Sequence, residues 1–431
     1  MLRRRLRNLM HAIRQWGQVP SFGFIQGHGH LSDADLLEIG RLVGEEDAEL
    51  ISEFENGFAG LIGEGHAVSF AAGRMGFYAL MKACGINEGD EVVLQGGTCS
   101  VMVNAVLRIG AAPIYADVDP ETFGSSAARI SKVLTARTRM IVAQHSFGIP
   151  CDIRPIADLA RERDIFLVED CALTVGSSVD GIVCGNFGNA ALFSTDHSKP
   201  INTVSGGMIY TNSRELHGRL KAIQSDCASL SKKRQQALWH QLLYEREYCS
   251  PERYGKTRLL NMFRSLSGAT KPSFLDEDFG TAFSSGYPYP ALMPAFLAAI
   301  GMKEILRWEE TREIRKAILN ELLELFDQYG VRMPAVYRDP SRDIVPLRLA
   351  WSSEDAEHVR NRLAHILHIS WIWFMQPVIA TSEPLENFGY LAGQCPISET
   401  IGPRMINIPC TISREWAESL KESINACLEG Y

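Results

Sequence analysis

Between about residue 66 and residue 211, the pattern of apolar and polar positions changes repeatedly from one period to another. Runs of four or five mainly apolar residues predict strands, and apolar residues three or four apart predict helices. The predicted strands are 92–95, 113–117, 139–143, 165–169, 189–193 and 207–211, and helices are predicted over 76–84, 99–109 and 153–163. This alternation is typical of an α/β domain with a mainly parallel sheet.

The remaining parts of the chain have different patterns. Ser32 is placed as the N-cap of a helix. Residues 212–285 read as a helical insert that either covers the sheet or faces the substrate as a lid, and a long helix is predicted over about 294–328. We therefore expect an N-terminal basic arm, a large α/β domain that contains the insert, and a smaller α+β C-terminal domain. Their predicted ranges are 1–30, 31–285 and 286–431.

The first sixteen residues, MLRRRLRNLMHAIRQW, combine apolar residues at helical spacing with arginines that lie between them, among them Arg3, Arg4, Arg5 and Arg7. They lack the apolar core of a signal peptide. Two readings remain, an ordinary helix with a solvated basic face or an interfacial helix on anionic lipid, and the first is favoured. No apolar run in the chain approaches the length that spans a bilayer.

Composition narrows the choice of function. The 43 Lys and Arg against 51 Asp and Glu give a formal charge of −8, which argues against a general nucleic-acid binder. The ten cysteines form no C-x-x-C pair, so reduced thiols in a cytoplasmic protein are expected, and no metal site.

Residues that could take part in catalysis or ligand binding follow several of the apolar runs. In open α/β sheets ligands bind beyond the carboxyl ends of the strands. A glycine at a helix start lets an anion approach free backbone N–H groups, and a lysine amine can form an imine with a carbonyl. The candidates are Gly73, His145, Glu169, Asp170, Ser194 and Lys199. For His145, a satisfied structural role and proton transfer both remain open.

Gly73, Asp170, Ser194 and Lys199 come in this order on successive strand–helix units, and the surrounding segments resemble one family. These segments are INEGDEVV (86–93), GAAPIYADVDPETF (110–123), VAQHSFGIPCDI (142–153), VEDCA (168–172) and MINIPCTISREW (405–416). They are similar to the DegT/DnrJ/StrS-type sugar aminotransferases, which are pyridoxal 5′-phosphate (PLP) enzymes of fold type I. The resemblance implies that fold for this chain.

The resemblance also implies roles for individual residues. Lys199 matches the lysine that holds PLP as an imine, and Asp170 matches the aspartate that pairs with the pyridinium nitrogen. Ser194 and the segment Gly73, Arg74 and Met75 match the phosphate cradle.

Some positions depart from the family pattern. Leu173 stands where a Gln or His is common, and Thr98 and Cys99 stand where an aromatic residue is common. GYPYP (286–290), with Tyr287 and Tyr289 as possible substrate contacts, lacks the Asn and Arg of the family's N-Y-R-like motif.

The implied activity is transfer of an amino group to a keto-sugar, with a nucleotide-linked sugar and glutamate as the expected substrates, in glycan or antibiotic sugar synthesis. A homodimer with a shared active site is expected. Two alternatives stay open: a sugar dehydratase that uses pyridoxamine phosphate, against which Lys199 argues, and a non-catalytic binding protein of the same fold.

Overall fold

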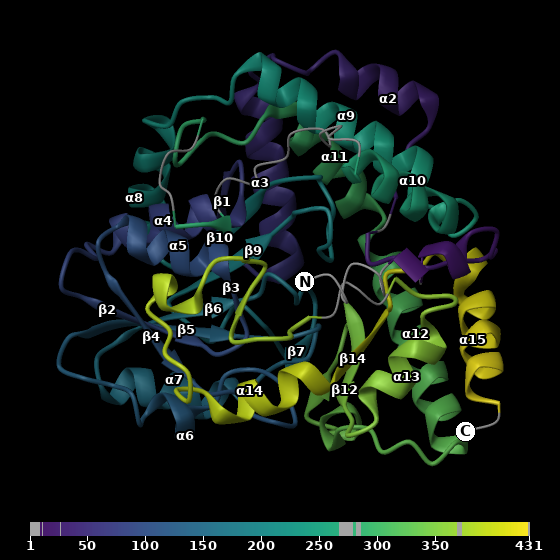
Figure 1. The fold of residues 1–431 in the computed structure, drawn as a ribbon. Coiled ribbons are helices and arrows are strands. Elements are labelled where there is room, and N and C mark those ends of the chain that lie inside the picture. The colour runs from purple at the N-terminus through teal and green to yellow at the C-terminus, as the bar shows by residue number, and fades with distance from the viewer. Residues whose placement is uncertain are drawn as a thin grey trace.

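A seven-stranded sheet forms the centre of the fold (Figure 1). The computed structural model describes residues 9–10, 12–25, 27–266, 279–281, 286–368 and 373–429. In spatial order the strands are β1 (His66–Phe70), β10 (Gly207–Thr211), β9 (Ala190–Ser194), β6 (Phe166–Asp170), β5 (Thr138–Gln144), β2 (Glu91–Gln95) and β4 (Ala112–Ala116). β10 runs opposite to the other six strands of this sheet. The six strands predicted from the apolar runs are confirmed, as is the mainly parallel α/β sheet.

Helices connect the strands. The predicted helices are confirmed as α4 (Gly73–Ala83), α5 (Ser100–Arg108) and α7 (Ile153–Glu162), and α6 (Ala127–Ile130) is a further short one. Ser32 caps α2 (Asp33–Gly40) through a capping box with Asp35, as its position predicted. The next helix, α3 (Ala48–Ile62), leads into β1.

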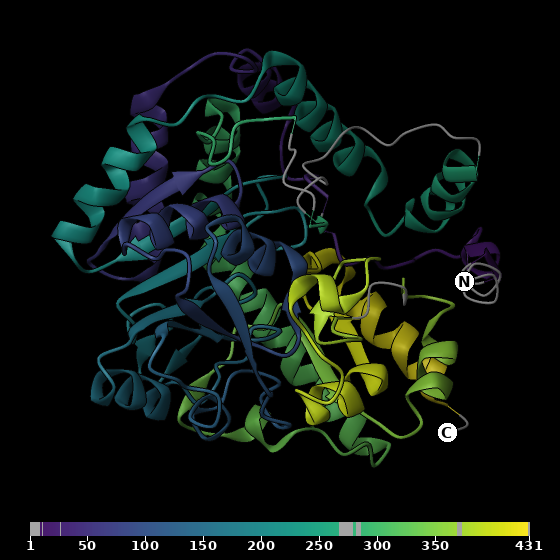
Figure 2. The same cartoon turned by 60° about the vertical axis from the view of Figure 1, so that its left-hand side comes forward.

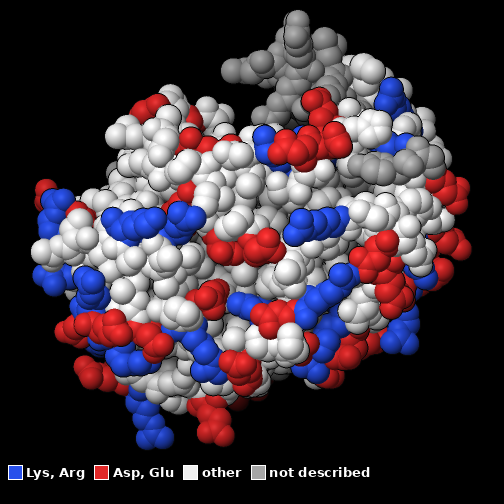
Figure 3. All heavy atoms as spheres, turned by 90° about the horizontal axis from the view of Figure 1, so that it is seen from below, with Lys and Arg blue, Asp and Glu red and all other residues white. Residues whose placement is uncertain are grey.

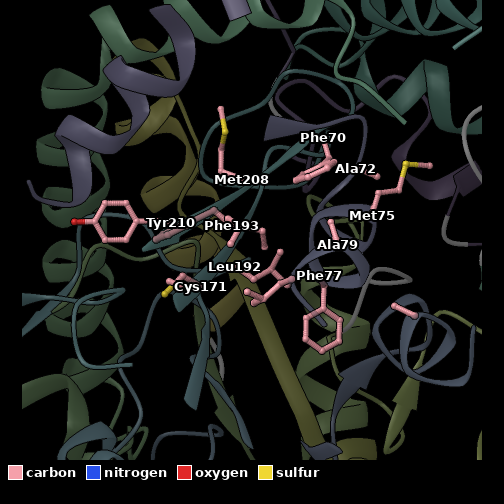
Figure 4. Packing of buried hydrophobic residues seen from close by; sticks show 14 of the residues in the cluster. Phe70, Ala72, Met75, Phe77, Ala79, Cys171, Leu192, Phe193, Met208 and Tyr210 are labelled. Carbon is pink, nitrogen blue, oxygen red and sulfur yellow. The ribbon is translucent and has the colours of Figure 1, made fainter. Parts of the chain in front are cut away.

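The main hydrophobic core lies where α3, α4 and α11 (Ala295–Leu306) pack against the strands β1, β9 and β10. Phe70, Phe77 and Phe193 are fully buried there, and Figure 4 shows their rings among Leu192 and Met208. Burial of aromatic side chains contributes a large share of core stability. This core therefore holds the strand ends near Gly73 and Ser194 in place.

A second core belongs to a smaller unit, seen on the right of Figure 1. Its two-stranded antiparallel sheet pairs β12 (Arg348–Ser352) with β14 (Met405–Pro409), and α12 (Trp308–Gln328), α13 (Ala356–Leu363) and α15 (Arg414–Leu428) pack around it. The N-terminal segment joins this unit, because Phe22 forms a parallel bridge with Leu367. The domain boundary at residue 286 stays a prediction.

The single long helix predicted over 294–328 was wrong. The chain forms α11 and α12 instead, with the break at Arg307. The two helices pack into different cores, so they diverge although the apolar spacing continues across the break. The Arg307 side chain lies 2.9 Å from His30 Nδ1 and 3.7 Å from a Glu304 oxygen, which anchors the junction.

The segment predicted as a helical insert forms α8 (Arg214–Ser225), α9 (Lys232–Tyr248) and α10 (Tyr254–Leu266). Figure 2 shows α9 and α10 extending from the sheet toward the N-terminal segment. Residues 267–278 and 282–285 of the insert lie outside the described residues, as does most of the predicted N-terminal basic helix.

Short elements complete the fold. These are β3 (Thr98–Cys99), β7 (Ser178–Val179), β8 (Ile182–Val183), β11 (Arg342–Asp343), β13 (Val378–Ile379), α14 (Pro396–Ile401), and the 3-10 turns Ala335–Arg338, Leu385–Phe388 and Gly402–Arg404. In the described part of the chain, no helix combines the length and apolar character needed to cross a bilayer. The face in Figure 3 carries basic and acidic side chains interspersed, without a continuous patch of either sign.

Candidate active site

The predicted site residues gather at one edge of the sheet. Because β10 runs opposite to β1 and β9, those two strands run in the same direction as β6, β5 and β2. Their carboxyl ends therefore meet at a common edge. Gly73 follows β1, Ser194 ends β9 and Asp170 ends β6. The apolar runs in the sequence predicted that these residues lie at strand ends. The spatial order of the strands in the sheet brings those ends to the same edge.

The start of α4 forms a close-packed cradle. A Cβ built on Gly73 would lie 3.3 Å from Ser194 Cβ, and a Cβ on Gly207 would lie 2.3 Å from Gly73 Cα. Ala72 caps the helix without a side-chain hydrogen bond, so the first backbone N–H groups of α4 are not occupied by a capping side chain. Such a helix start favours an anion. Small residues at 73 and 207 let a ligand approach this backbone.

Arg74 and Met75 follow in α4. Arg74 is buried, its guanidinium lies 5.8 Å from the Phe279 ring centroid, and its carbonyl accepts a hydrogen bond from Tyr289. The Met75 side chain lies in the main core, and its backbone N–H donates to Ala72. The geometry thus favours Gly73 and Arg74 over Met75 as anion donors.

Asp170 presents a buried carboxyl group at the end of β6. One of its oxygens accepts a hydrogen bond of 2.9 Å from the backbone N–H of Ala172. Burial raises the pKa of this carboxyl, while the Ala172 N–H, the Lys199 cation and His145 act in the opposite direction. A positively charged nitrogen bound beside Asp170 would hold it as the anion.

His145 and Glu169 form a separate buried pair. His145 Nδ1 accepts a hydrogen bond of 3.0 Å from the Cys151 N–H, and Nε2 lies 3.2 Å from a Glu169 oxygen. Glu169 also accepts hydrogen bonds from the backbone N–H groups of Gly185, Phe187 and Gly188. Both ring nitrogens of His145 are therefore engaged within the protein, which favours its structural role over proton transfer.

Lys199 lies in the loop between β9 and β10. Its Nζ is 5.6 Å from the centroid of the Trp373 ring. The same cation acts to lower the pKa of the Asp170 carboxyl and of the Cys99 thiol, against the effect of burial, so it lies within electrostatic range of both. Arg74 also acts on Cys99. The structure thus brings together the amine, the carboxyl group and the start of α4.

Thr98, Cys99 and Leu173 line the surroundings. Thr98 and Cys99 form β3, which pairs in parallel with β13 of the C-terminal half. Burial raises the pKa of the Cys99 thiol, and this favours the neutral form. Leu173 is buried in the turn after Asp170 and offers an apolar surface only.

The GYPYP segment lies against α4. Tyr289 donates its hydrogen bond of 3.2 Å to the Arg74 carbonyl, and the Arg108 guanidinium stacks 4.0 Å from its ring centroid. Tyr287 is buried, with Arg234 at 5.0 Å from its ring centroid. Tyr289 therefore reaches the predicted phosphate cradle, whereas the contacts of Tyr287 lead to α9.

Charged residues far away in sequence hold the lysine loop. Glu245 of α9 is fully buried, and its carboxylate lies 3.0 Å from His197 Nδ1 and accepts a bond of 3.4 Å from Asn202. These two partners lie two residues before and three residues after Lys199. Arg315 of α12 donates a hydrogen bond of 2.6 Å to the carbonyl of Pro200, the residue that follows the lysine.

Sequence reasoning missed Glu245 and Arg315 because each reads as one charged residue among several in a long helix. It also missed Trp373 of the smaller unit, whose ring lies 5.6 Å from the Lys199 amine. The extra length of the insert was the one sequence signal that pointed toward α9. No pattern within α9 distinguishes the buried Glu245 from its exposed neighbours.

Known proteins resemble this chain over most of its length. A sequence profile of the DegT/DnrJ/EryC1/StrS aminotransferase family matches residues 45–419. GDP-perosamine synthase of Escherichia coli O157:H7 is 28% identical over 389 residues, which cover 87% of this chain and 89% of that enzyme. The GDP-perosamine synthase of Caulobacter vibrioides is 36% identical over 174 residues, 40% of this chain and 47% of that enzyme.

Solved structures match the fold. An aminotransferase from Psychrobacter cryohalolentis has a TM-score of 0.69 at 18% identity, covering 93% of this chain and 98% of its own. A Streptococcus pneumoniae protein in its PLP form has a TM-score of 0.68 at 15% identity, covering 96% and 98%. These likenesses show the fold-type-I architecture of the PLP aminotransferases.

Proposed function

The chain belongs to the DegT/DnrJ/EryC1/StrS aminotransferase family, and from this premise we propose that it transfers an amino group from glutamate to a keto-sugar. The observation that carries the proposal is the meeting of Lys199, Asp170 and the start of α4 at one edge of the sheet. Aminotransfer needs an amine, a partner for the pyridinium nitrogen and an anion site, and these residues supply all three.

The residues fit pyridoxal 5′-phosphate. The N–H groups at Gly73 and Arg74, with the Ser194 hydroxyl, would hold the phosphate, since a helix start without a capping side chain favours an anion. Asp170 would accept a hydrogen bond from the pyridinium nitrogen, and Leu173 would contribute apolar contact. Lys199 would supply the amine that bonds to the carbonyl carbon of the cofactor.

When bound, the cofactor supplies an electron sink that stabilises negative charge at the substrate carbon. The protein residues direct this chemistry. Asp170, as the anion, keeps the ring nitrogen protonated, which strengthens the sink. Lys199, once its amine is free, serves as base and then as acid for the proton that moves during amino transfer. The Trp373 ring lies 5.6 Å from this amine and favours its charged form through a cation–π contact.

The names of similar enzymes suggest the class of acceptor substrate. Two of them are GDP-perosamine synthases, whose name indicates a nucleotide-linked amino sugar. We therefore propose a nucleotide-linked keto-sugar as the acceptor. We also propose a homodimer that shares its active sites, as the family resemblance implies, and a cytoplasmic location, which suits ten cysteines without a disulfide.

Visible absorption of the purified protein tests the proposal, measured before and after glutamate is added. Wild type loaded with PLP is expected to be yellow and to lose this band with glutamate. Lys199→Ala is expected never to form the lysine-dependent band, because no other described amine is placed beside Asp170. Lys132→Ala, an exposed lysine, is the matched control and should behave as wild type.

A wild-type protein that stays colourless after PLP is added contradicts the proposal. A non-catalytic binding protein of the same fold would then be the better description. Light scattering after size-exclusion chromatography tests the homodimer separately, and a mass near the 47.9 kDa of one chain would overturn it.

A further inference from the structure

Two buried N–H groups near Lys199 have no hydrogen-bond partner among the described residues. They are Nδ2 of Asn407, a residue that is only 6% exposed, and Nε1 of Trp373. Both residues belong to the smaller unit, and the Trp373 ring faces the Lys199 amine at 5.6 Å. Leaving a buried donor without an acceptor costs stability, so such groups call for an explanation.

The orientation of the Asn407 amide is fixed by its neighbours. Its Oδ1 accepts a hydrogen bond of 2.8 Å from the backbone N–H of Trp373 and a longer one of 3.4 Å from the Arg348 guanidinium. A flipped amide would place its own NH₂ group against these donors. Nδ2 must therefore point away from both, and it meets no hydrogen-bond acceptor among the described residues.

Arg348 brings positive charge to the same place. It opens β12, where its side chain shares a face of the small sheet with Asn407, because Ala350 pairs with Asn407 two residues further on. Its guanidinium lies 4.5 Å from the Phe24 ring centroid, and burial lowers its pKa to about 9.

The backbone of Arg348 reaches the large sheet. Its N–H donates to the carbonyl of Phe147, in the segment after β5. The cluster therefore adjoins the carboxyl edge of the sheet on one side, and Trp373 connects it with Lys199 on the other.

We propose that Arg348, Trp373 and Asn407 bind the carboxylate of the amino donor, and we call them the carboxylate subsite. This inference rests on the proposed aminotransferase function and deepens it by assigning the donor's place. The subsite offers a cation and two N–H donors, so it matches an acceptor-only anion. A neutral sugar, whose hydroxyls both donate and accept, would leave its own donors unmatched there.

The position also fits amino transfer. A donor amino acid carries its carboxylate on the carbon next to the amine, so an anion site must adjoin the lysine that the amine replaces. The Trp373 ring covers Lys199, while the Trp373 backbone is bonded to Asn407. One residue thus connects the reacting amine with the subsite.

Asn407→Asp gives the sharpest test, because it keeps an oxygen for Trp373 and Arg348 but replaces the free N–H donor with negative charge. We expect the KM for glutamate to rise about 10- to 100-fold, the range for losing a hydrogen bond to a charged group. Calorimetric titration with 2-oxoglutarate should show a parallel loss of affinity. Asn320→Asp, exposed on α12, is the matched control and should leave both values unchanged.

A carboxylate-free amine sharpens the assignment. Wild type should prefer glutamate to butylamine in the first half-reaction, and Asn407→Asp should lose most of this preference. Trp373→Phe, which keeps a ring over Lys199 but removes Nε1, should raise the glutamate KM by a smaller factor. It also serves as the test if Asn407→Asp does not fold.

The outcomes separate the two hypotheses. If wild type never reacts with glutamate, the proposed function fails. If wild type reacts and both variants keep its KM and its 2-oxoglutarate affinity, the carboxylate subsite is overturned. If the loss appears only with the nucleotide-linked keto-sugar, the bound anion is a phosphate and the assignment to the amino donor is wrong.

Discussion

The surroundings of Lys199 are built in two different ways. On the glycine side, comprising Gly73, Ser194, Gly206 and Gly207, backbone packs directly against backbone. On the charged side, comprising His197, Glu245 and Arg315, the buried Glu245 and Arg315 and the partly buried His197 hold the loop through side chains. The glycine side provides a surface that an anion can approach, whereas the charged side determines where the lysine loop lies.

The difference lies in what each side tolerates. Close backbone contact leaves no room for one additional carbon atom, as the 2.3 Å from a Gly207 Cβ to Gly73 Cα shows. Gly206 adds a φ of +141°, which L side chains rarely adopt. Buried ions tolerate changes of shape but not the loss of a partner, because an unpaired charge in the interior is costly. The two sides should therefore fail under different mutations and conditions.

Removing the carboxylate of the charged side should have the largest effect. Glu245→Ala leaves His197 and His28 without their buried anion, and the expected loss is about 3–5 kcal/mol of unfolding free energy. Urea denaturation followed by circular dichroism measures it. Glu252→Ala, exposed in the following turn, is the control. Equal stability of the two variants would contradict a buried ionic clamp.

Adding one methyl group to the glycine side comes next. Gly207→Ala should lower the unfolding free energy by about 1–3 kcal/mol, because its Cβ overlaps the backbone of Gly73. PLP affinity, measured by absorbance titration, should fall with it. Gly218→Ala in α8, where nothing lies within 4 Å of the new Cβ, should instead be neutral or stabilising.

The two sides should also differ in their response to pH. Although burial lowers it, the pKa of His197 is raised to about 9 by Asp196 and Glu245, from 6.5. Although burial raises it, the pKa of Glu245 is lowered to about 2 by hydrogen bonds from His197 and His28, from 4.5. The His197 contribution is complete below pH 6.5 and is lost as the pH rises through about 9, and the Glu245 contribution is complete above pH 4.5 and is lost as the pH falls toward 2.

Glu245→Gln should remove both pH-dependent contributions to stability, that of His197 and that of Glu245. The difference in melting temperature between wild type and this variant is expected to be greatest from pH 4.5 to 6.5 and to shrink by a few degrees outside that range. Melting curves from pH 4 to 10 measure it. A difference that is constant with pH would show that the clamp is not ionic.

A surface pair supplies the smallest expected effect. Arg154 and Asp180 form an ion pair of 2.6 Å in which each side chain is about half exposed. Arg154→Ala should cost less than about 1 kcal/mol, since water and salt screen such pairs. The unfolding free energy of Arg154→Ala, measured under the same conditions, gives the reference value for an exposed ion pair. A loss as large as that of Glu245→Ala would contradict the stronger effect expected for the buried charges.

Three candidate residues of the site were predictable because their positions depend on local pattern. Gly73, Asp170 and Ser194 each follow an apolar run, and strands that run in parallel bring their ends to one edge. The break at Arg307 was not predictable, because apolar spacing continues through it and only the two separate cores require it. Trp373 was missed because its ring reaches Lys199 from a different unit.

The sequence by itself determined the strands, the helices that alternate with them, the family and the order of Gly73, Asp170, Ser194 and Lys199, because short-range periodicity and local motifs encode these features. Only the tertiary structure decided which distant charges meet the lysine loop and which amide bonds the backbone of Trp373. Glu245, Arg348 and Asn407 are ordinary polar residues in their own segments. They acquire a role through burial and through partners that are remote along the chain, and no local pattern encodes those.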